Sequence, residues 1–383
     1  MTDVPGPIRV MVVTSTLWAG GAERHLVTVL PALDRDRFQI VLCCVQEEGD
    51  YFRALSDAGV RCVNLGSPKR RQALRALRGL VRELRRFRPH VVLTFPLNAD
   101  VVGRIAATLT GVPVVAAWKH SCGYTRRHPL DRRSERLLAP MTDYCVGVAA
   151  AQIPFLVDEL GVPRRKIRIV PNGIDLSGFP VRPGRERDAA LSRELGVGSD
   201  DPVVGILARL RPEKDHAMFL RAARVVADRR PDAWFLILGD GPLQAELEEL
   251  ARKLGLADRT VFAGKRYDVS RILALLDVSV LSSANDCFPY AALESMATAV
   301  PVVATAVGAI PEIVEDGVTG HLIPPGDSEA LGRRVLELLQ HPDDARAMGL
   351  AGRRRVELHF TAERSVRGLE DLLSEIVGVG RPH

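Results

Sequence analysis

The sequence lacks several features that mark membrane-spanning, secreted or metal-binding proteins. Its 383 residues contain no run of about 18 consecutive apolar residues, so we expect no transmembrane helix. The N-terminal stretch has no basic start followed by a long apolar core, which argues against a secretory signal. The six cysteines show no CxxC spacing. This pattern predicts reduced thiols, a cytoplasmic location and no metal site.

Acidic residues are scarce in one segment. Residues 69–88 hold nine basic residues and a single acid, Glu83, whereas the whole chain has a formal net charge of only +5. Such local basicity argues against a general nucleic-acid-binding protein. The segment also has apolar residues at helical spacing, which predicts an amphipathic helix: Leu74, Leu77, Leu80, Val81, Leu84 and Phe87.

Two interpretations of this basic helix, Lys69 to Arg88, stay open. Its arginines can form the solvated face of a helix that covers a sheet. Alternatively, they can dock peripherally on anionic lipid at the inner face of a membrane, where each basic residue contributes about 1 kcal/mol. A second basic cluster follows in the same half of the chain: Arg126, Arg127, His128, Arg132 and Arg133.

The first half of the chain alternates between strand-like and helix-like patterns. Residues 8–14 are almost continuously apolar over the length of a strand, as expected for a strand buried on both faces. Further strands are predicted at 40–45, 91–95, 112–117, 144–148 and 167–170. Strands that alternate with helices in this way predict an α/β domain with a parallel, Rossmann-like sheet.

The alternation stops at residues 176–200, which are polar and contain proline and glycine, and it then restarts. We therefore expect an N-terminal domain at 1–175, a linker at 176–200, a C-terminal domain at 201–358 and a final helix at 359–383. This helix can pack back on either domain, and the N-terminal domain is one candidate. Because open α/β sheets bind ligands at the carboxyl ends of their strands, two such domains predict a site in a cleft between them. Strands of the second half are predicted at 203–207, 233–238, 260–262, 278–281 and 300–304.

Two short segments carry residues suited to binding a phosphorylated ligand. Gly20 and Gly21 follow the first strand and open a helix, whose N-terminus favours anions. They do not form GxGxxG, and taken alone such a pair is commonly a tight turn. Arg209 and Lys214 lie between a strand and a helix, where two fixed cations would stabilise a departing diphosphate. The alternative is two surface cations in a loop.

A third segment, residues 282–305, has the pattern strand, loop, helix, strand. Pro289 suits the first position of a helix, so the amides around it can face a ligand. Glu294 follows Asp286 by eight residues, and a carboxylate is a common way to hold the vicinal hydroxyls of a ribose. The alternative is that Asp286 caps the helix and Glu294 is a solvated helix residue.

In this order, the three segments resemble the retaining glycosyltransferases of family 4, which have the GT-B fold. The resemblance extends over nearly the whole chain and includes VPNGID at 170–175, GKRYDVSRILALLDVSVLSS at 264–283 and VPVVATAVGAIPEIVEDGVTGHLIPPGD at 300–327. It implies two Rossmann-like domains that face a central cleft.

The resemblance also implies roles for individual residues. Arg209 and Lys214 would bind the donor diphosphate, and Glu294 would hold the ribose. Asp286 would hold hydroxyls of the donor sugar, and His120 would contact that sugar near the reacting carbon. We therefore expect catalysis to depend on His120, Arg209, Lys214 and Asp286. The remaining expected donor contacts are Gly20, Gly21, Arg266, Cys287, Phe288, Pro289 and Tyr290, with Arg266 beside the base.

The chain departs from the family pattern at two positions. Asp286 stands where the family has glutamate, so its carboxylate ends about 1.5 Å shorter. Cys287 stands where the family has glycine, which adds a side chain beside the expected position of the sugar. Either change can alter the choice of donor or reduce activity.

The expected function is transfer of a sugar from a UDP- or GDP-sugar to an acceptor hydroxyl, with retained configuration and without metal or other cofactor. The acceptor would be a lipid-linked sugar or a small metabolite, in the synthesis of cell-surface polysaccharide, glycolipid or glycoconjugate. Two alternatives stay open: a sugar-nucleotide epimerase or phosphorylase of the same fold, and a non-catalytic protein that binds sugar nucleotides. Conversion of donor without acceptor would indicate an epimerase, and tight binding without transfer would indicate the non-catalytic protein.

Overall fold

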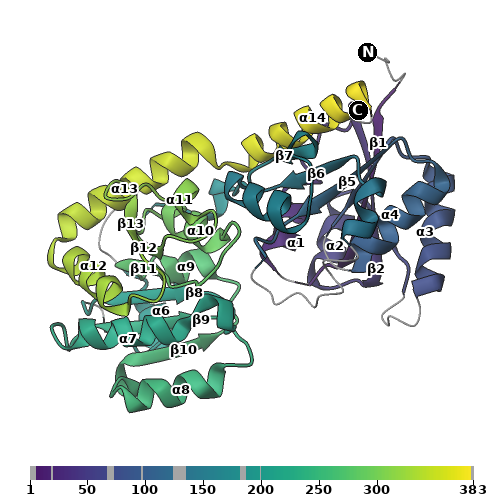
Figure 1. Cartoon of the computed structure of the whole chain (residues 1–383). Helices are drawn as coiled ribbons and strands as arrows, with labels where there is room; N and C mark the ends of the chain where they lie inside the picture. Colours follow the sequence, from purple (N-terminus) through teal and green to yellow (C-terminus); the bar gives the residue numbers. More distant parts are fainter. Residues whose placement is uncertain are drawn as a thin grey trace. The chain divides into compact units, whose positions relative to one another are not determined.

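The chain folds into two compact α/β units (Figure 1). The structure is a computed structural model that describes residues 6–18, 20–66, 73–95, 98–123, 135–181, 187–198 and 200–380. The first unit consists of Met1–Gly173 together with Ala362–His383, and the second of Ile174–Thr361. Residues 176–200, the expected linker, therefore cluster with the second unit. The expected cleft between the domains stays a prediction.

The first unit is built on a seven-stranded parallel sheet in the order β3-β2-β1-β4-β5-β6-β7. Six of these strands lie where the sequence predicts them. The seventh, β3, was missed because it is a short edge strand with half-exposed residues. The strands are β1 (Ile8–Thr16), β2 (Phe38–Glu47), β3 (Arg61–Asn64), β4 (Val91–Thr94), β5 (Val114–Lys119), β6 (Tyr144–Gly147) and β7 (Ile167–Ile169).

The last helix of the chain belongs to this first unit. Glu370 accepts a hydrogen bond from the backbone N–H of Asp34 at 2.8 Å and pairs with Arg37, and the hydroxyl of Tyr144 donates to the carbonyl of Gly380. The end of the chain thus ties together strand ends that are far apart in sequence. The longer helices of the unit are α1 (Gly21–Val29), α2 (Asp50–Asp57), α3 (Ala73–Phe87), α4 (Asn98–Thr110) and α14 (Ala362–Val379).

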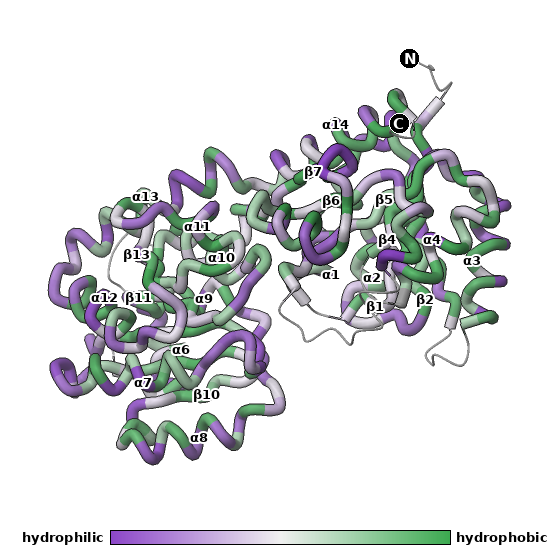
Figure 2. The backbone as a smooth tube through the Cα atoms, viewed as in Figure 1, coloured by the Kyte–Doolittle hydropathy of each residue, from purple (hydrophilic) through white to green (hydrophobic). Residues whose placement is uncertain are grey.

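Helix α3 is the described part of the basic segment, and Figure 2 shows hydrophobic and hydrophilic stretches alternating along it. Leu80, Leu84 and Phe87 are buried against the sheet, as their spacing predicts. The prediction was wrong for Leu74, which is 69% exposed at the start of the helix. Residues 69–72 and the second basic cluster at 126–133 lie outside the described residues. No helix in the described ranges is long and apolar enough to span a membrane.

The second unit has a six-stranded parallel sheet in the order β10-β9-β8-β11-β12-β13. The sequence predicts all of these strands except β13, a four-residue edge strand. They are β8 (Val203–Leu207), β9 (Trp234–Leu238), β10 (Thr260–Gly264), β11 (Val278–Leu281), β12 (Val302–Thr305) and β13 (Gly320–Ile323). The helices are α6 (Ala189–Glu194), α7 (His216–Ala227), α8 (Gln244–Lys253), α9 (Val269–Leu273), α10 (Tyr290–Ala297), α11 (Ile310–Ile313), α12 (Ser328–Gln340) and α13 (Pro342–His359).

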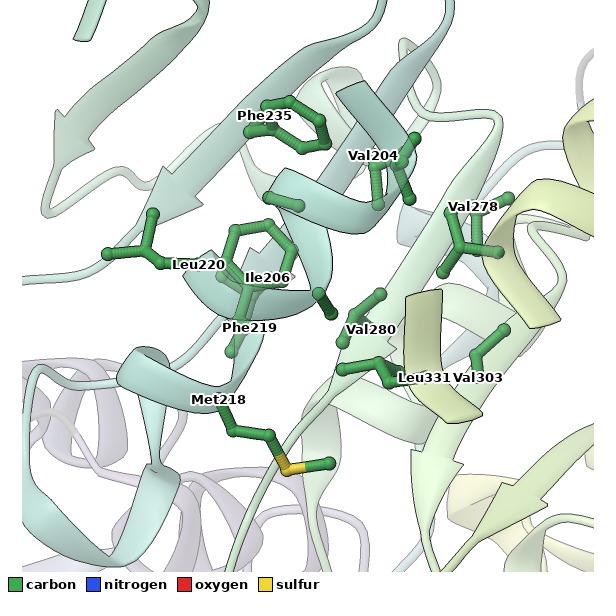
Figure 3. Close-up of a cluster of buried hydrophobic side chains, with 14 of the residues drawn as sticks. Val204, Ile206, Met218, Phe219, Leu220, Phe235, Val278, Val280, Val303 and Leu331 are labelled. Carbon is green, nitrogen blue, oxygen red and sulfur yellow. The ribbon is translucent and has the colours of Figure 1, made fainter. Parts of the chain in front are cut away.

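An apolar core holds the helices of the second unit on its sheet. Figure 3 shows Val204, Phe235 and Val280 from the strands close to Phe219 of α7 and Leu331 of α12. All five side chains are almost completely buried. Branched side chains fit central parallel strands that are covered on both faces, so these strands have near-continuous apolar sequences. This packing makes the sheet a rigid base for the loops at its carboxyl edge.

In each sheet the strand order reverses at one place, between β1 and β4 in the first unit and between β8 and β11 in the second. The loops that leave neighbouring strands there run in opposite directions and open a crevice at the carboxyl edge. Ligands of doubly wound sheets bind at this position. The candidate site residues follow β1 and β5 in the first unit and β8 and β11 in the second, except Arg266, which follows β10.

Candidate active site

Lys214 and Arg209 lie in the loop that leaves β8. This loop ends in a short 3₁₀ turn, Pro212–Lys214, and then Asp215 caps helix α7. Asp215 has a left-handed backbone with φ of 42°, and its carboxylate accepts a hydrogen bond from the N–H of Met218 at 3.0 Å. An aspartate tolerates this conformation because its side chain makes such a local bond. Lys214 is therefore held at the entry to a helix rather than in a free loop.

The loop after β11 is fastened to the loop that carries Lys214. The hydroxyl of Ser282 donates to the carbonyls of both Lys214 and Asp215, each at 2.9 Å. The N–H of Ala284 donates to the carbonyl of Glu213 at 3.0 Å. These bonds fix the two loops that meet at the reversal of the strand order.

Asp286 forms an ion pair with Lys214 through Oδ2 and Nζ. The hydroxyl of Ser283 also donates to Asp286 Oδ2, at 3.2 Å. Side-chain exposure is 24% for Lys214 and 11% for Asp286, so the pair is partly shielded from water and its attraction exceeds that of a surface pair. The structure therefore brings together a predicted phosphate ligand and a predicted sugar ligand.

Gly308, which follows β12, supports the backbone of Asp286. A Cβ at Gly308 would lie 1.6 Å from the carbonyl oxygen of Asp286, and its φ of 52° is left-handed. No other residue fits this position without displacing the acid-bearing loop. The sequence reasoning did not single out Gly308, although it lies within the segment at 300–327 that carries the family resemblance. The role of Gly308 depends on its contact with the backbone of Asp286, and that contact is visible only in the folded structure.

Glu294 lies on α10, and its side chain is buried. This finding contradicts the alternative of a solvated helix residue. Asp286 does not cap α10 either, because the cap position is occupied by Pro289, with φ of −72° and ψ of 120°. Pro289 thus lies one position earlier than predicted, and Tyr290 is the first helical residue. Neither alternative given for the two acids therefore holds.

The residues between these two acids are only partly open to solvent. Phe288 and Tyr290 are buried, and Cys287 is partly buried. The ring of Phe288 packs on Phe360 with centroids 5.9 Å apart. Cys287, next to Asp286 in the chain, is thus more exposed than the two aromatic residues that follow it closely.

Arg266 has carboxylate partners of its own. Its guanidinium makes bonds of 2.8 and 2.7 Å to Asp268 and also pairs with Glu194. Hydrogen bonds to Asp268 and Glu194 raise the pKa of Arg266 above its usual value. It follows β10, the edge strand two positions from β8 in the sheet. A role beside a nucleotide base stays a prediction.

In the first unit, Gly20 is the residue before helix α1. Its φ of −157° is extended backbone that any residue adopts, so no backbone strain requires glycine there. A Cβ would lie 2.4 Å from Glu23 Oε2, the end of a flexible side chain. The contact of the pair Gly20–Gly21 with a ligand stays a prediction.

His120 follows β5 and lies in a cluster of rings. Its ring centroid is 4.6 Å from Phe95, 5.5 Å from Trp118 and 5.7 Å from His25. His120 Nε2 and Trp118 Nε1 are buried and have no hydrogen-bond partner among the described residues. Such atoms are uncommon in a folded protein and often belong to a ligand or water site.

Burial keeps both imidazoles of this cluster neutral. It lowers the pKa of His25 to about 3, and burial together with the neighbouring His25 lowers the pKa of His120 well below its usual value. A neutral imidazole near pH 7 can accept one hydrogen bond and donate another, so His120 is suited to hold a hydroxyl rather than to act as an acid. His25 was missed by the sequence reasoning, although it follows the Gly pair in GGAERH.

Lys119, the residue before His120, belongs to a buried network of four charged side chains that the sequence reasoning also missed. Lys119 pairs with Asp100 and, at 2.8 Å, with Glu135, and Arg104 pairs with the same two acids. Burial alone would raise the pKa of Asp100, but Lys119 and Arg104 outweigh it and hold that pKa well below the usual range. Two cations and two anions are thus balanced within the domain. Among the described residues, no cluster of His, Cys, Asp and Glu could hold a metal ion.

Comparisons with known proteins agree with this architecture. The sequence profile of the family described as "Glycosyl transferases group 1" matches residues 188–355, and that of "Glycosyltransferase Family 4" matches residues 19–177. The UDP-Gal:alpha-D-GlcNAc-diphosphoundecaprenol alpha-1,3-galactosyltransferase of Escherichia coli is 27% identical over 374 residues, 93% of this chain and 94% of that protein. The 2-deoxystreptamine glucosyltransferase of Streptomyces kanamyceticus is 30% identical over 270 residues, 67% of this chain and 69% of that protein.

The fold has close counterparts among solved structures. The crystal structure of Anabaena HepE in complex with UDP-glucose superimposes with a TM-score of 0.84 at 20% identity, covering 96% of this chain and all of that chain. The two parallel α/β units and this similarity define the GT-B fold. The chain belongs to the glycosyl transferases group 1 family.

Proposed function

We propose that this glycosyltransferase moves a sugar from a nucleoside diphosphate sugar, with UDP- and GDP-sugars as the candidate donors, and retains the anomeric configuration. One observation carries the proposal. Lys214, Asp286 and the buried Glu294 come from loops and a helix that follow β8 and β11, at the reversal of the strand order. Support for the donor class comes from HepE, solved with UDP-glucose, and from the E. coli relative named for UDP-Gal.

In this proposal the ion-paired residues Lys214 and Asp286 both bind the donor. The diphosphate competes with the carboxylate of Asp286 for the ammonium of Lys214, and Arg209 adds a second cation from the same loop. Asp286 then accepts hydrogen bonds from hydroxyls of the donor sugar. Glu294 holds the ribose, and neutral His120 holds a sugar hydroxyl near the reacting carbon.

The chemical step breaks the bond between the anomeric carbon and the diphosphate oxygen. Negative charge grows on that oxygen as the bond lengthens, and fixed cations stabilise this state more than the ground state. The acceptor hydroxyl attacks from the face that the diphosphate leaves, so the configuration is retained. Its proton passes to the departing phosphate oxygen. In this scheme, Lys214 and Arg209 supply the positive charge that a metal ion supplies in other transferases.

A panel of nucleotide sugars tests the donor class. A ligand that binds only the folded state raises apparent stability by about 2.7 kcal/mol at 100 times its Kd, so a true donor should raise the Tm by several degrees. We expect UDP- or GDP-sugars to do so, with UDP-glucose and UDP-galactose as first probes. Lys214→Ala should reduce the shift at the same donor concentration, because one of the proposed phosphate ligands is lost. If no nucleotide sugar shifts the Tm of the wild-type protein, the proposed donor class is wrong.

We further propose that the acceptor is lipid-linked and that the exposed face of α3 docks on anionic lipid. No carboxylate within the described ranges pairs with the arginines of this face, and Glu83 is instead buried beside Arg61 at 2.9 Å. A helix face with charges of one sign and no internal partner attracts a surface of the opposite sign. The E. coli relative is named for a diphosphoundecaprenol acceptor, which supports a lipid surface. The face consists of Arg75, Arg78, Arg82, Arg85 and Arg86, and Arg88 follows directly after the helix.

Replacing Arg78, Arg82 and Arg85 with serine tests this docking. At about 1 kcal/mol for each basic residue, partitioning onto phosphatidylglycerol vesicles should weaken roughly 100-fold at low ionic strength. Cosedimentation with these vesicles measures the effect. The control variant replaces three exposed arginines of the second unit, Arg221, Arg333 and Arg354, and should bind like the wild type. Equal loss in both variants would mean that net charge, rather than α3, determines binding.

A further inference from the structure

Gln152 bridges two loops at the carboxyl edge of the first sheet. It ends a short 3₁₀ turn, Ala150–Gln152, that follows β6, and its side chain has no exposed surface. Its Oε1 accepts hydrogen bonds from the N–H groups of Val148 and Ala149, at 2.5 and 3.1 Å. Its Nε2 donates to the carbonyls of Lys119 and Ser121, at 3.0 and 3.1 Å. The side chain of Gln152 therefore uses all its hydrogen-bonding capacity on backbone groups.

The two carbonyls that accept from Gln152 flank one residue, His120. The amide thus fixes the backbone on both sides of the imidazole without being part of its ring cluster. On the preceding side, the Lys119 ammonium is also held by Asp100 and Glu135. The backbone at His120 is consequently fixed by the hydrogen bonds from Gln152, called the Gln152 clamp below, and by the buried ion pairs of Lys119.

Gly147 provides the space that the Gln152 clamp occupies. A Cβ at Gly147 would lie 3.0 Å from Oε1 of Gln152 and 2.9 Å from Cδ1 of Ile169. These contacts are too short for an ordinary side chain, so an alanine there would press on the amide of Gln152. A glycine at the end of β6 therefore leaves room for the side chain of Gln152.

We propose that Gln152 is a positioning residue that sets the imidazole of His120 for contact with the donor sugar. The inference rests on the proposed role of His120 in transfer. Without the two donated bonds, the Lys119–Ser121 backbone can rotate its carbonyls, and the imidazole moves with it. A displacement of about 1 Å in a catalytic contact costs as much as 100-fold in rate.

The variant Gln152→Glu tests this inference because it keeps the size and the accepting oxygen but loses the donor to Lys119 and Ser121. We expect kcat for transfer to fall about 10- to 100-fold, with the KM for the nucleotide sugar within about threefold. The donor contacts at Lys214 and Glu294 are untouched, so binding of the nucleotide should persist. Gly147→Ala is the second variant, since it presses on the amide without changing its chemistry, and it should show a smaller loss of the same kind.

Combining each variant with His120→Ala separates positioning from general damage. If Gln152 acts through His120, Gln152→Glu will have no further effect on kcat in the His120→Ala background. If the two losses multiply, Gln152 acts on the fold as a whole and the inference is overturned. Wild-type activity of His120→Ala alone would instead overturn the proposed role of His120. Should Gln152→Glu fail to fold, the Gly147→Ala cycle decides in the same way.

Discussion

Replacing Lys214 with alanine should lower kcat for sugar transfer by about 100- to 1,000-fold, the loss typical when one fixed group that stabilises transition-state charge is removed. The backbone of Lys214 is held by the turn at Pro212–Lys214 and by bonds from Ser282 to the carbonyls of Lys214 and Asp215, and its ammonium pairs with Asp286. The ammonium is therefore in place before the diphosphate departs. Initial rates with saturating donor and acceptor measure the effect.

Arg211→Ala is the matched control, because Arg211 is an exposed cation in the same loop. It should retain kcat within about twofold of the wild type, as expected for a surface position. Lys214→Ala also leaves Asp286 without its cation, so the Tm of both variants must accompany the rates. Near wild-type turnover of a folded Lys214→Ala protein would rule out this account of phosphate binding.

The largest loss of stability is expected from Asp100→Asn, which should reduce the free energy of unfolding by about 3–5 kcal/mol. Asp100 is a shared partner of Lys119 and Arg104, all three side chains are at most 7% exposed, and Thr94 donates to the same carboxylate. Without its charge, two buried cations share only Glu135. Urea denaturation followed by circular dichroism gives the change directly.

An exposed ion pair provides the comparison for this variant. Asp57 lies 3.7 Å from Arg53 on the surface of α2, with side-chain exposure of 73% and 92%. Asp57→Asn should change the free energy of unfolding by less than about 0.5 kcal/mol, since such pairs are screened by water. Similar effects at both sites would mean that the buried network is not balanced as described.

The central strands were predictable because they are buried on both faces and therefore have continuous apolar sequences. The edge strand β3 was missed because partial exposure weakens its apolar pattern. The edge strand β13 is mostly buried, but it is only four residues long and contains a glycine and a histidine, so it lacks an apolar run. Candidate site residues such as Lys214 and Asp286 could be proposed because each lies in a short segment with its own strand, loop and helix pattern and within the family resemblance. Sequence order alone was enough to place these loops at the carboxyl edge of the sheet.

The supporting residues could not be found in this way. Asp100, Lys119 and Glu135 come from separate segments, and none has a local pattern that distinguishes it from a surface charge. Gln152 is a single polar residue whose four hydrogen bonds exist only once β5 and β6 are paired. Gly308 is likewise required by its close approach to the carbonyl of Asp286, which is 22 positions earlier in the chain. Contacts between distant segments define these roles, and one sequence does not encode them locally.

The first unit also has an unusual order of synthesis. Its final helix, α14, contributes Glu370 and the carbonyl of Gly380 to contacts with Asp34, Arg37 and Tyr144, yet it is translated only after all of Ile174–Thr361. Domains usually fold in the order in which they leave the ribosome. In this chain, synthesis of the second unit is complete at Thr361, whereas the first unit is complete only after α14 has been synthesised. The N-terminal unit is therefore the one that a nascent chain exposes longest to chaperones and proteases.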